Sequence, residues 1–373
     1  MSSIGYYCDP QGIEPHAHAE LQRYAQQPAI GALRAFTDIH YCAEKALPVG
    51  VAFAATNHVF PLVTGKDIGC GVMYLRIGKE HWRKLFDKRA HFDAWQRAHG
   101  AMTDDGLGGG NHFLSLEEDD EAVYVICHTG TRNRGIALYQ RCVELCRQYA
   151  QEAGGDGESV PAGRFDDAFR AYYTDTLRFG YARRKAFCLQ TMAFLQGAQY
   201  VGASGPVARD YGQGLFAERD EEGRLHGTPY RLGDSVHNHL RFDGDTVLHR
   251  KGSTELVPGR TAVLPLSMSR GSLLVTATGR AGEALWSCAH GAGRKLSRFA
   301  AQKHWRTVLK EKERRAYRAQ FPELLGHNGE FPKGTVQELD YAYKPDDDIF
   351  RYQPYLRLVT RTRPIATIKY TEI

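Results

Sequence analysis

Five short segments of this chain combine strong metal ligands with glycine or a neighbouring amide. The segments are Asp67-Ile-Gly-Cys70-Gly, Gly109-Gly-Asn111-His112, Cys127-His128-Thr-Gly, Asp234-Ser-Val-His237-Asn and Cys288-Ala-His290-Gly-Ala-Gly. Glycine lets the backbone approach a bound group closely, and a strand before the loop fixes the direction of the side chain. The pattern therefore predicts one polynuclear metal centre, with the first three ligand segments each ending an apolar, strand-like run.

The predicted metal ligands are Asp67, Cys70, His112, His128 and His237. A thiolate, imidazoles and a carboxylate together suit a borderline divalent ion such as Mn²⁺, Zn²⁺, Co²⁺ or Fe²⁺. A thiolate has several lone pairs, so Cys70 could bridge two ions while the other side chains complete their shells. Two ions held close together can stabilise an in-line phosphoryl displacement. Taken alone, each residue could equally be an ordinary buried side chain, so the prediction depends on the whole set.

The segment His290-Gly-Ala-Gly-Arg294 places an imidazole beside small residues and a guanidinium. Small neighbours leave room for a phosphorus centre to reach the ring, and histidine can carry a phosphoryl or nucleotidyl group covalently. Arg294, and Arg298 one helical turn later, could hold phosphate oxygens. Arg132 and Lys251 are further candidates for phosphate contacts, although an exposed turn without such a role is an equal alternative for Lys251.

The composition is that of a globular protein, with 373 residues, 42% of them hydrophobic and 24% charged. No apolar run approaches the roughly 18 residues that span a bilayer, and the N-terminus lacks the features of a secretory signal, so we expect a cytoplasmic protein without membrane contacts. The eight cysteines form no Cys-x-x-Cys pair, which argues against a disulfide framework and a zinc ribbon. Ten Lys and Arg residues lie between Arg294 and Arg318 against two glutamates. A polyanionic partner and a solvated helix face would both account for this excess.

Short strands and long helices without a regular strand–helix–strand repeat indicate an α+β fold. We expect helices at 15–28, 80–100, 133–151 and 165–203, and a long basic helix at 294–319. Strands are expected at 49–55, 58–63, 71–77, 123–127, 246–249, 261–265, 273–277, 355–360 and 365–370. Residues 37–40 are expected to form a loop. Because ligand segments occur in both halves of the chain, we expect one domain over residues 1–373.

These motifs resemble those of the RtcB family of RNA ligases over most of the chain. The matching segments include Asp38-Ile-His40, the five ligand segments, His249-Arg-Lys251, Pro265-Leu-Ser267-Met268, Ala342-Tyr343-Lys344 and Ile368-Lys369. The resemblance implies a large single-domain α+β fold with mixed sheets and a central metal cleft. It also implies a ligase, dependent on GTP and two Mn²⁺ ions, that joins an RNA 3′-phosphate or 2′,3′-cyclic phosphate to a 5′-hydroxyl during RNA repair.

The family pattern also implies roles for individual residues. His290 would attack the α-phosphate of GTP and carry GMP, which then passes to the RNA 3′-phosphate and is displaced by the 5′-hydroxyl. A cyclic phosphate would first be opened by water. The implied nucleotide contacts are Asn111, Ser267, Met268, His290 and Lys369, and the implied RNA-phosphate contacts are Arg132, Lys251, Arg294 and Arg298.

Several points stay open at the level of sequence. Ser115 stands where the family pattern has a glutamate, so a carboxylate at the nucleotide is absent and nucleotides other than GTP are possible. The substrate could be broken tRNA or rRNA, and a release-factor homologue or an archease-type helper could act in the same pathway. One alternative function is a dinuclear-metal phosphoesterase that acts on cyclic or terminal RNA phosphates without ligation and does not need His290. Another is a non-catalytic RNA-end binding module, which the presence of His290, Arg294 and Asn111 disfavours.

Overall fold

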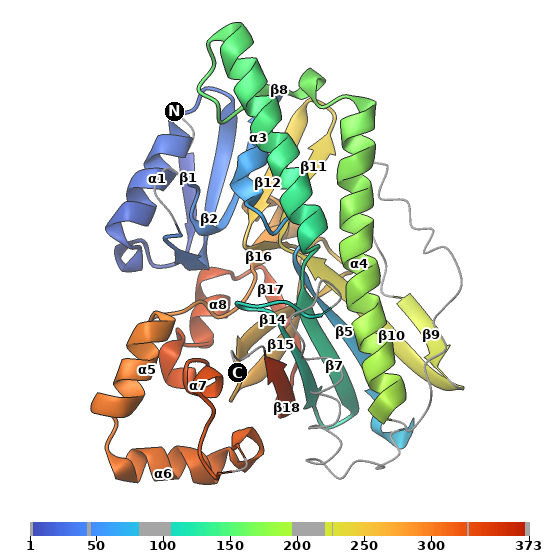
Figure 1. The fold of residues 1–373 in the computed structure, drawn as a ribbon, viewed down its shortest axis with the longest axis vertical. Coiled ribbons are helices and arrows are strands. Elements are labelled where there is room, and N and C mark those ends of the chain that lie inside the picture. The colour runs from blue at the N-terminus through green and yellow to red at the C-terminus, as the bar shows by residue number, and fades with distance from the viewer. Residues whose placement is uncertain are drawn as a thin grey trace.

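The computed structural model describes residues 3–42, 46–81, 106–195, 221–225, 227–326 and 328–369. These residues form a mixed α/β structure with several β-sheets (Figure 1). The helix expected at 80–100 lies almost entirely outside the described residues, as does the last part of the helix expected at 165–203. Within the described ranges, none of the helices combines the length and the apolar character needed to cross a bilayer.

The largest sheet is antiparallel and has the strand order β18-β6-β7-β5-β10-β9. Its strands are β5 (Gly71–Gly78), β6 (Phe113–Glu118), β7 (Ala122–Thr129), β9 (Glu221–Leu225), β10 (Thr228–Val236) and β18 (Arg363–Lys369). Successive side chains of a strand point to opposite faces. One face, with Met73 and Leu75, is covered by helix α4 (Asp167–Leu195), and the other, with Val72 and Tyr74, packs against a second sheet.

That second sheet contains β14 (Thr261–Ser267), β15 (Gly271–Ala277) and β17 (Leu356–Arg361). A five-stranded sheet has the order β1-β2-β3-β12-β11, with α1 (Pro15–Ala25) packed on it. Its strands are β1 (Ser3–Tyr7), β2 (Ile30–His40), β3 (Val49–Thr56), β11 (Asn238–Asp243) and β12 (Thr246–Lys251). Two short pairs, β4 (His58–Val59) with β8 (Val160–Pro161) and β13 (Ser253–Glu255) with β16 (Ser287–Ala289), complete the sheets of the described residues. Helix α3 (Asn133–Ala153) lies beside α4 (Figure 1).

Most of the expected strands and the helices near 15–28 and 133–151 are confirmed, but two local expectations are wrong. Residues 37–40 are not a loop, because they form the buried end of strand β2. The strand expected at 58–63 ends after two residues, and Pro61–Thr64 form a 3₁₀ turn instead. Proline at the first position of that turn has no N–H to donate to a sheet and suits a helical start.

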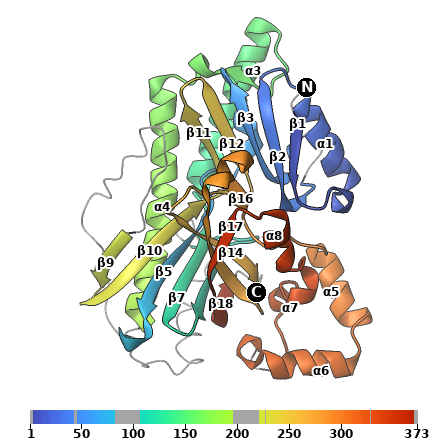
Figure 2. The ribbon, with the colours of Figure 1, turned by 180° about the vertical axis from the view of Figure 1, so that it is seen from behind.

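The single basic helix expected at 294–319 is also wrong. The segment forms two helices, α5 (Arg298–Thr307) and α6 (Glu311–Gln320). The break has a local cause, because the Lys310 backbone N–H donates to the Glu313 side chain at 2.7 Å and this cap begins a new helix. With α7 (Lys333–Val336), these helices enclose a small core around Trp305, and Figures 1 and 2 show them apart from the long helix α4. Helix α8 (Asp347–Tyr352) packs on β2.

Candidate active site

The side chains predicted as metal ligands converge at one point. The Sγ atom of Cys70 lies 3.5 Å from His112 Nε2 and 3.2 Å from His128 Nε2. His112 Nε2 is also 3.3 Å from Asp67 Oδ2, and His128 Nε2 is 3.3 Å from His237 Nε2. The ligand atoms form two groups, Asp67–Cys70–His112 and Cys70–His128–His237, each with all its atoms within 4.8 Å of one another. Cys70 belongs to both groups, as a bridging thiolate would.

The sequence suggested that the ligands follow strands, but only some of them do. His128 lies in β7 and His237 directly follows β10, but Cys70 and His112 directly precede β5 and β6. They still meet because β6, β7, β5 and β10 are antiparallel neighbours, so that the start of one strand lies beside the end of the next. The register shows this directly, since Phe113 pairs with His128 in the ladder.

The chemistry of these side chains fits divalent cations. Cys70, His112, His128 and His237 are all buried. Burial, and after it the charge of Asp67, raises the pKa of the Cys70 thiol well above its usual value. Burial also lowers the pKa of His237, as do His290 and His128, and this favours the neutral imidazole that a metal needs. A cation would reverse the cost of a buried thiolate, because a coordinated thiol is deprotonated.

Helix α4 contributes Arg184, a residue that the sequence did not single out. Its guanidinium forms a bidentate ion pair with Asp234 of β10, at 2.6 and 2.7 Å. It also donates to the backbone carbonyls of Gly69 and Thr129, at 2.9 and 3.0 Å. The guanidinium is fully buried, and the two carbonyls belong to residues adjacent in the chain to Cys70 and to the ligand in β7.

Arg184 thus connects β5, β7 and β10 at the level of the ligands. No local pattern marks it in the sequence, because Arg183 and Lys185 flank it and only the tertiary structure shows which of the three turns inward. The sequence marked Asp234 only as the first residue of a ligand segment and did not predict its ion pair. Its partner is 50 residues away in the chain.

His290 lies beside the ligand cluster, where its ring centroid is 4.9 Å from that of His237. Asp38 Oδ2 accepts hydrogen bonds from the His290 backbone N–H at 2.7 Å and from ring Nδ1 at 2.5 Å. Burial alone would lower the pKa of His290, but the Asp38 carboxylate, with help from the Gly252 backbone, raises it above its usual value. Asp38 therefore fixes both the backbone and the ring of the predicted nucleophile.

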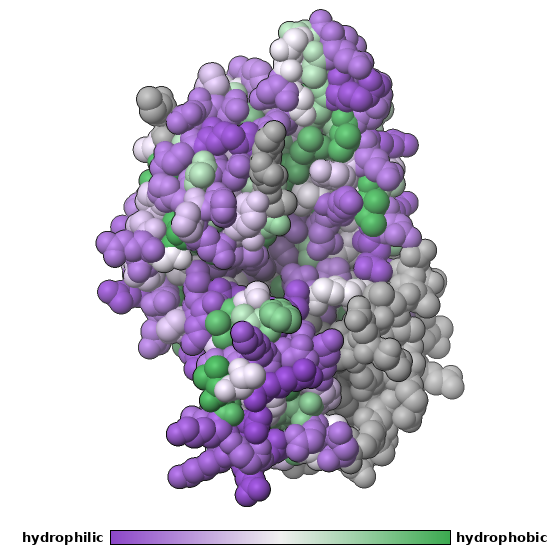
Figure 3. Space-filling view, turned by 60° about the vertical axis from the view of Figure 1, so that its left-hand side comes forward, coloured by the Kyte–Doolittle hydropathy of each residue, from purple (hydrophilic) through white to green (hydrophobic). Residues whose placement is uncertain are grey.

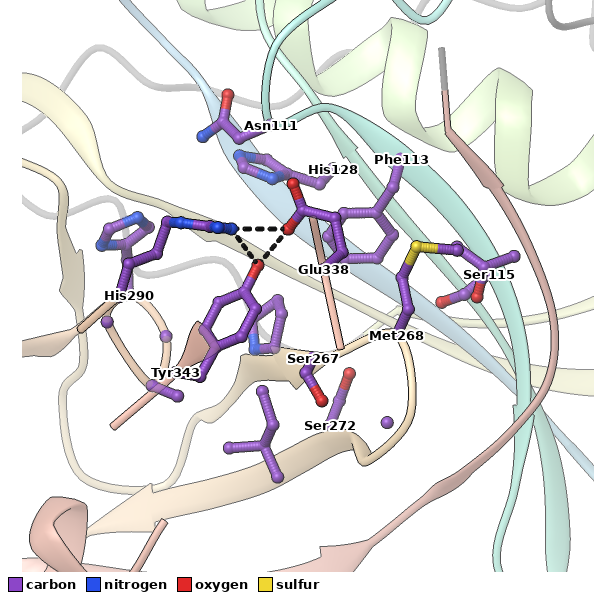
Figure 4. Close-up of a pocket in the computed structure, with 18 of the residues that line it drawn as sticks. Asn111, Phe113, Ser115, His128, Ser267, Met268, Ser272, His290, Glu338 and Tyr343 are labelled. Carbon is purple, nitrogen blue, oxygen red and sulfur yellow. Dashed lines mark hydrogen bonds and ion pairs between the residues drawn. The ribbon is translucent and has the colours of Figure 1, made fainter. Parts of the chain in front are cut away.

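A cavity of about 310 Å³ is lined by residues of this cluster and by several of the predicted nucleotide contacts (Figure 4). His128 and His290 line it together with Asn111, Ser267 and Met268. His290 and Ser115 lie at opposite sides of the view in Figure 4. The backbone of Lys369 pairs with that of Phe113 at the edge of β6, but the Lys369 side chain lies outside the described part of the structure.

A carboxylate that the sequence did not predict also lines this cavity. Glu117 accepts hydrogen bonds from the hydroxyls of Thr362, Ser115 and Ser272, at 2.5, 2.7 and 3.2 Å. Burial raises its pKa, although the three hydroxyls partly offset the shift. Glu117 follows Ser115 by two residues in β6, so both side chains lie on the cavity face of the strand.

Arg294 and Arg298 line the cavity, as a phosphate contact requires, but both are paired with a protein carboxylate. Glu338, which is buried, lies 3.0 Å from Arg294 Nη1 and 3.2 Å from Arg298 Nε. The hydroxyl of Tyr343 also donates to Glu338 (Figure 4). Glu338 was not among the predicted site residues, and nothing in its local sequence indicates this contact.

The other two predicted phosphate contacts are not among the residues that line the cavity. The guanidinium of Arg132 packs against Gly108 in the loop before β6. A Cβ atom at Gly108 would collide with Arg132 Nη1 and with His112 Nδ1, so the glycine makes room for both side chains. Lys251 Nζ donates to Cys42 Sγ at 3.2 Å. The phosphate roles of Arg132 and Lys251 stay predictions.

Comparison with known proteins finds relatives that are named as RNA ligases. A model of the family described as tRNA-splicing ligase RtcB matches residues 221–370. The chain is 26% identical to the RNA-splicing ligase RtcB2 of Escherichia coli, over 97% of this chain and 94% of that protein. It is 28% identical to the tRNA-splicing ligase RtcB of Methanocaldococcus jannaschii over 70% of this chain and 29% of that protein, and 28% identical to the RNA-splicing ligase RtcB of Mycobacterium tuberculosis over 70% and 64%. The family model and these relatives together support the assignment of the chain to the RtcB family.

Proposed function

We propose that this protein is an RNA ligase that joins 3′-phosphate or 2′,3′-cyclic phosphate ends to 5′-hydroxyl ends, with GMP carried on His290. The supporting observation is that His290 lines a cavity of nucleotide size and contacts the ligand cluster through His237. The names of the similar proteins point to the same activity. A phosphoesterase would not need a nucleophile held in this way by Asp38.

We place two Mn²⁺ ions at the two ligand groups that share Cys70. When bound, they would supply charge neutralisation for phosphate oxygens at the reacting phosphorus. Residues of the chain position the nucleophile. Asp38 holds Nδ1 of His290, so that Nε2 is the ring atom that attacks. Asp38 also stabilises the positive charge that the ring acquires when Nε2 forms a bond to phosphorus.

The chemistry has three steps. His290 Nε2 attacks the α-phosphorus of GTP, and pyrophosphate leaves as the N–P bond forms. An oxygen of the RNA 3′-phosphate then attacks the same phosphorus and releases the imidazole. Finally the 5′-hydroxyl oxygen attacks the activated 3′-phosphorus, loses its proton and displaces GMP. A cyclic phosphate first adds water across its P–O2′ bond to give the 3′-phosphate.

We propose that Glu117 supplies the carboxylate that Ser115 lacks. The ring of Phe113 lies 5.6 Å from that of His128, so the start of β6 is at the metal end of the cavity. With a rise of about 3.3 Å per residue, Glu117 lies roughly 13 Å further along the strand, a span on the scale of a nucleotide. A carboxylate there suits guanine, which presents two adjacent N–H donors, and opposes adenine, which presents an acceptor. This supports GTP as the cosubstrate.

The test is formation of an acid-labile protein–GMP adduct from radiolabelled GTP in the presence of Mn²⁺. His290→Ala should abolish the adduct and leave the bound manganese, measured by elemental analysis, nearly unchanged. His18→Ala, which alters a histidine of α1 that contacts Tyr6 and does not line the cavity, should retain both. Failure of the wild-type protein to form an adduct with any nucleotide would reject the proposal, and loss of metal in His290→Ala would make His290 a ligand.

A further inference from the structure

Helix α5 begins at the cavity and has two different faces. Arg298, its first residue, lines the cavity. Ala301 and Trp305 are buried in the small core of the C-terminal helices. Phe299, Lys303 and Arg306 follow the spacing i, i+4, i+7, which places them on one side of a helix. All three are exposed, so this side of α5 faces solvent.

Phe299 is unusual on this exposed side. Its exposed fraction is 77%, the largest among the big apolar side chains exposed in the described ranges, and it is the only aromatic one among them. Exposure of a whole aromatic ring is unfavourable in water, and exposed aromatic side chains are a common means of stacking unpaired nucleobases. Phe299 directly follows Arg298, which lines the cavity.

The charges on this side of α5 differ from those on α6. On α6, Arg314, Arg315 and Arg318 all form ion pairs with Glu311, and Arg318 also pairs with Glu330. Helix α5 contains no acidic residue, and no ion pair to Lys303 or Arg306 is found in the part of the chain that the structure describes. In Figure 3, hydrophilic side chains predominate in the lower part of the view, to the left of the grey residues. The positive charges of Lys303 and Arg306 are therefore available to an anionic partner.

We propose that Phe299, Lys303 and Arg306 form a track for single-stranded RNA that leads into the cavity. A nucleobase near the RNA end stacks on Phe299, while Lys303 and Arg306 contact phosphates of the same strand. The three residues span about 10 Å along the helix axis. Stacking and phosphate contacts tolerate any sequence, so the track accepts RNA ends without reading bases. This inference rests on the proposed RNA-end ligase activity and names the form of RNA that it takes.

The test measures binding of a fluorescent single-stranded RNA with a 3′-phosphate, by anisotropy over a range of salt concentrations. Phe299→Ala should weaken binding by about tenfold, and Phe299→Trp should restore it, because stacking needs an aromatic ring. Lys303→Gln with Arg306→Gln should weaken binding and reduce its dependence on salt. Val308→Ala, a matched loss of an exposed apolar side chain on the other side of the same segment, should bind like the wild type.

The protein–GMP adduct is measured in parallel, since it needs no RNA. Wild-type adduct formation by Phe299→Ala, together with weaker RNA binding, supports the track. Wild-type RNA binding by Phe299→Ala, or no rescue by Phe299→Trp, overturns it while leaving the ligase proposal intact. If the wild-type protein forms no adduct, the ligase proposal fails whatever the RNA binding shows.

Discussion

The two regions that meet at the cavity hold their polar side chains in different ways. Cys70, His112, His128 and His237 are buried and lie in or beside adjacent antiparallel strands, and a buried arginine from α4 ties those strands together. In α5 and α6 most charged side chains are exposed, and apart from Arg298, which pairs with the buried Glu338, they are either unpaired in the described structure or paired at the surface. Atoms that must meet a reacting phosphorus need fixed positions, whereas a variable RNA strand is better held by side chains that can adapt.

The largest effect is expected at the atom that the two ligand groups share. Cys70→Ala should remove both cations and all adduct formation, because neither group retains its full set of ligands. Elemental analysis of the purified protein measures the metal content. Cys142→Ala, which alters a buried cysteine of α3, should keep the wild-type metal content. Two ions still bound to Cys70→Ala would show that the thiolate does not bridge.

Removal of the buried guanidinium should have the next largest effect. Arg184→Met leaves the Asp234 carboxylate buried without its partner, which should cost about 3–5 kcal/mol in the free energy of unfolding. Urea denaturation measures this change. In the double variant Arg184→Met with Asp234→Leu, stability should recover in part, because no unpaired charge is left but the carbonyls of Gly69 and Thr129 still lack their donor. Manganese affinity should remain weakened in the double variant, and wild-type affinity there would mean that Arg184 does not position the ligands.

A smaller effect, on selectivity, is expected at the far end of the cavity. Glu117→Gln should reduce the preference for GTP over ATP in adduct formation by about tenfold, since one bidentate contact to guanine is lost. Glu118→Gln is the matched control, because Glu118 lies on the opposite face of β6 and pairs with Lys79. An unchanged preference in Glu117→Gln would place the base elsewhere.

Because the pKa of Glu117 is raised, the preference for GTP over ATP should depend on pH. As the pH falls through that raised pKa, the carboxyl becomes protonated and the preference for GTP should decrease. In Glu117→Gln the ratio of GTP to ATP use should be flat over the same range. The ratio cancels effects of pH on metal binding that are common to both nucleotides.

The smallest effect is expected at a surface pair of the helical region. Arg315 is exposed and lies 3.4 Å from Glu311 on α6. Arg315→Gln should leave both the melting temperature and RNA binding unchanged, because exposed ion pairs contribute little to stability. Calorimetry and anisotropy measure the two quantities. Weaker RNA binding in this variant would extend the proposed track from α5 onto α6.

Sequence patterns predicted the parts of the site that local chemistry marks. The order of ligands and glycines indicated a shared metal centre at Cys70, and its side chains do lie together. The apolar runs that form β5 and β7 were also predicted as strands. The break between α5 and α6 could not be predicted as readily, since it depends on one capping contact to Glu313.

The residues that support the site were not predicted, because their roles come from contacts distant in sequence. Asp38 lies 252 residues from His290, and Glu338 lies 44 residues from Arg294. Glu117 was missed for a different reason. The departure at Ser115 suggested an absent carboxylate, whereas the pleat of β6 puts Glu117 on the same face two residues later.

If two cations are held as proposed, with the sulfur of Cys70 common to both ligand groups, occupancy of one site would depend on occupancy of the other. Titration of the apoprotein would then show cooperative uptake rather than two separate affinities. Under the same proposal, oxidation of that one atom would weaken both sites together, and reduction of the thiol would restore them.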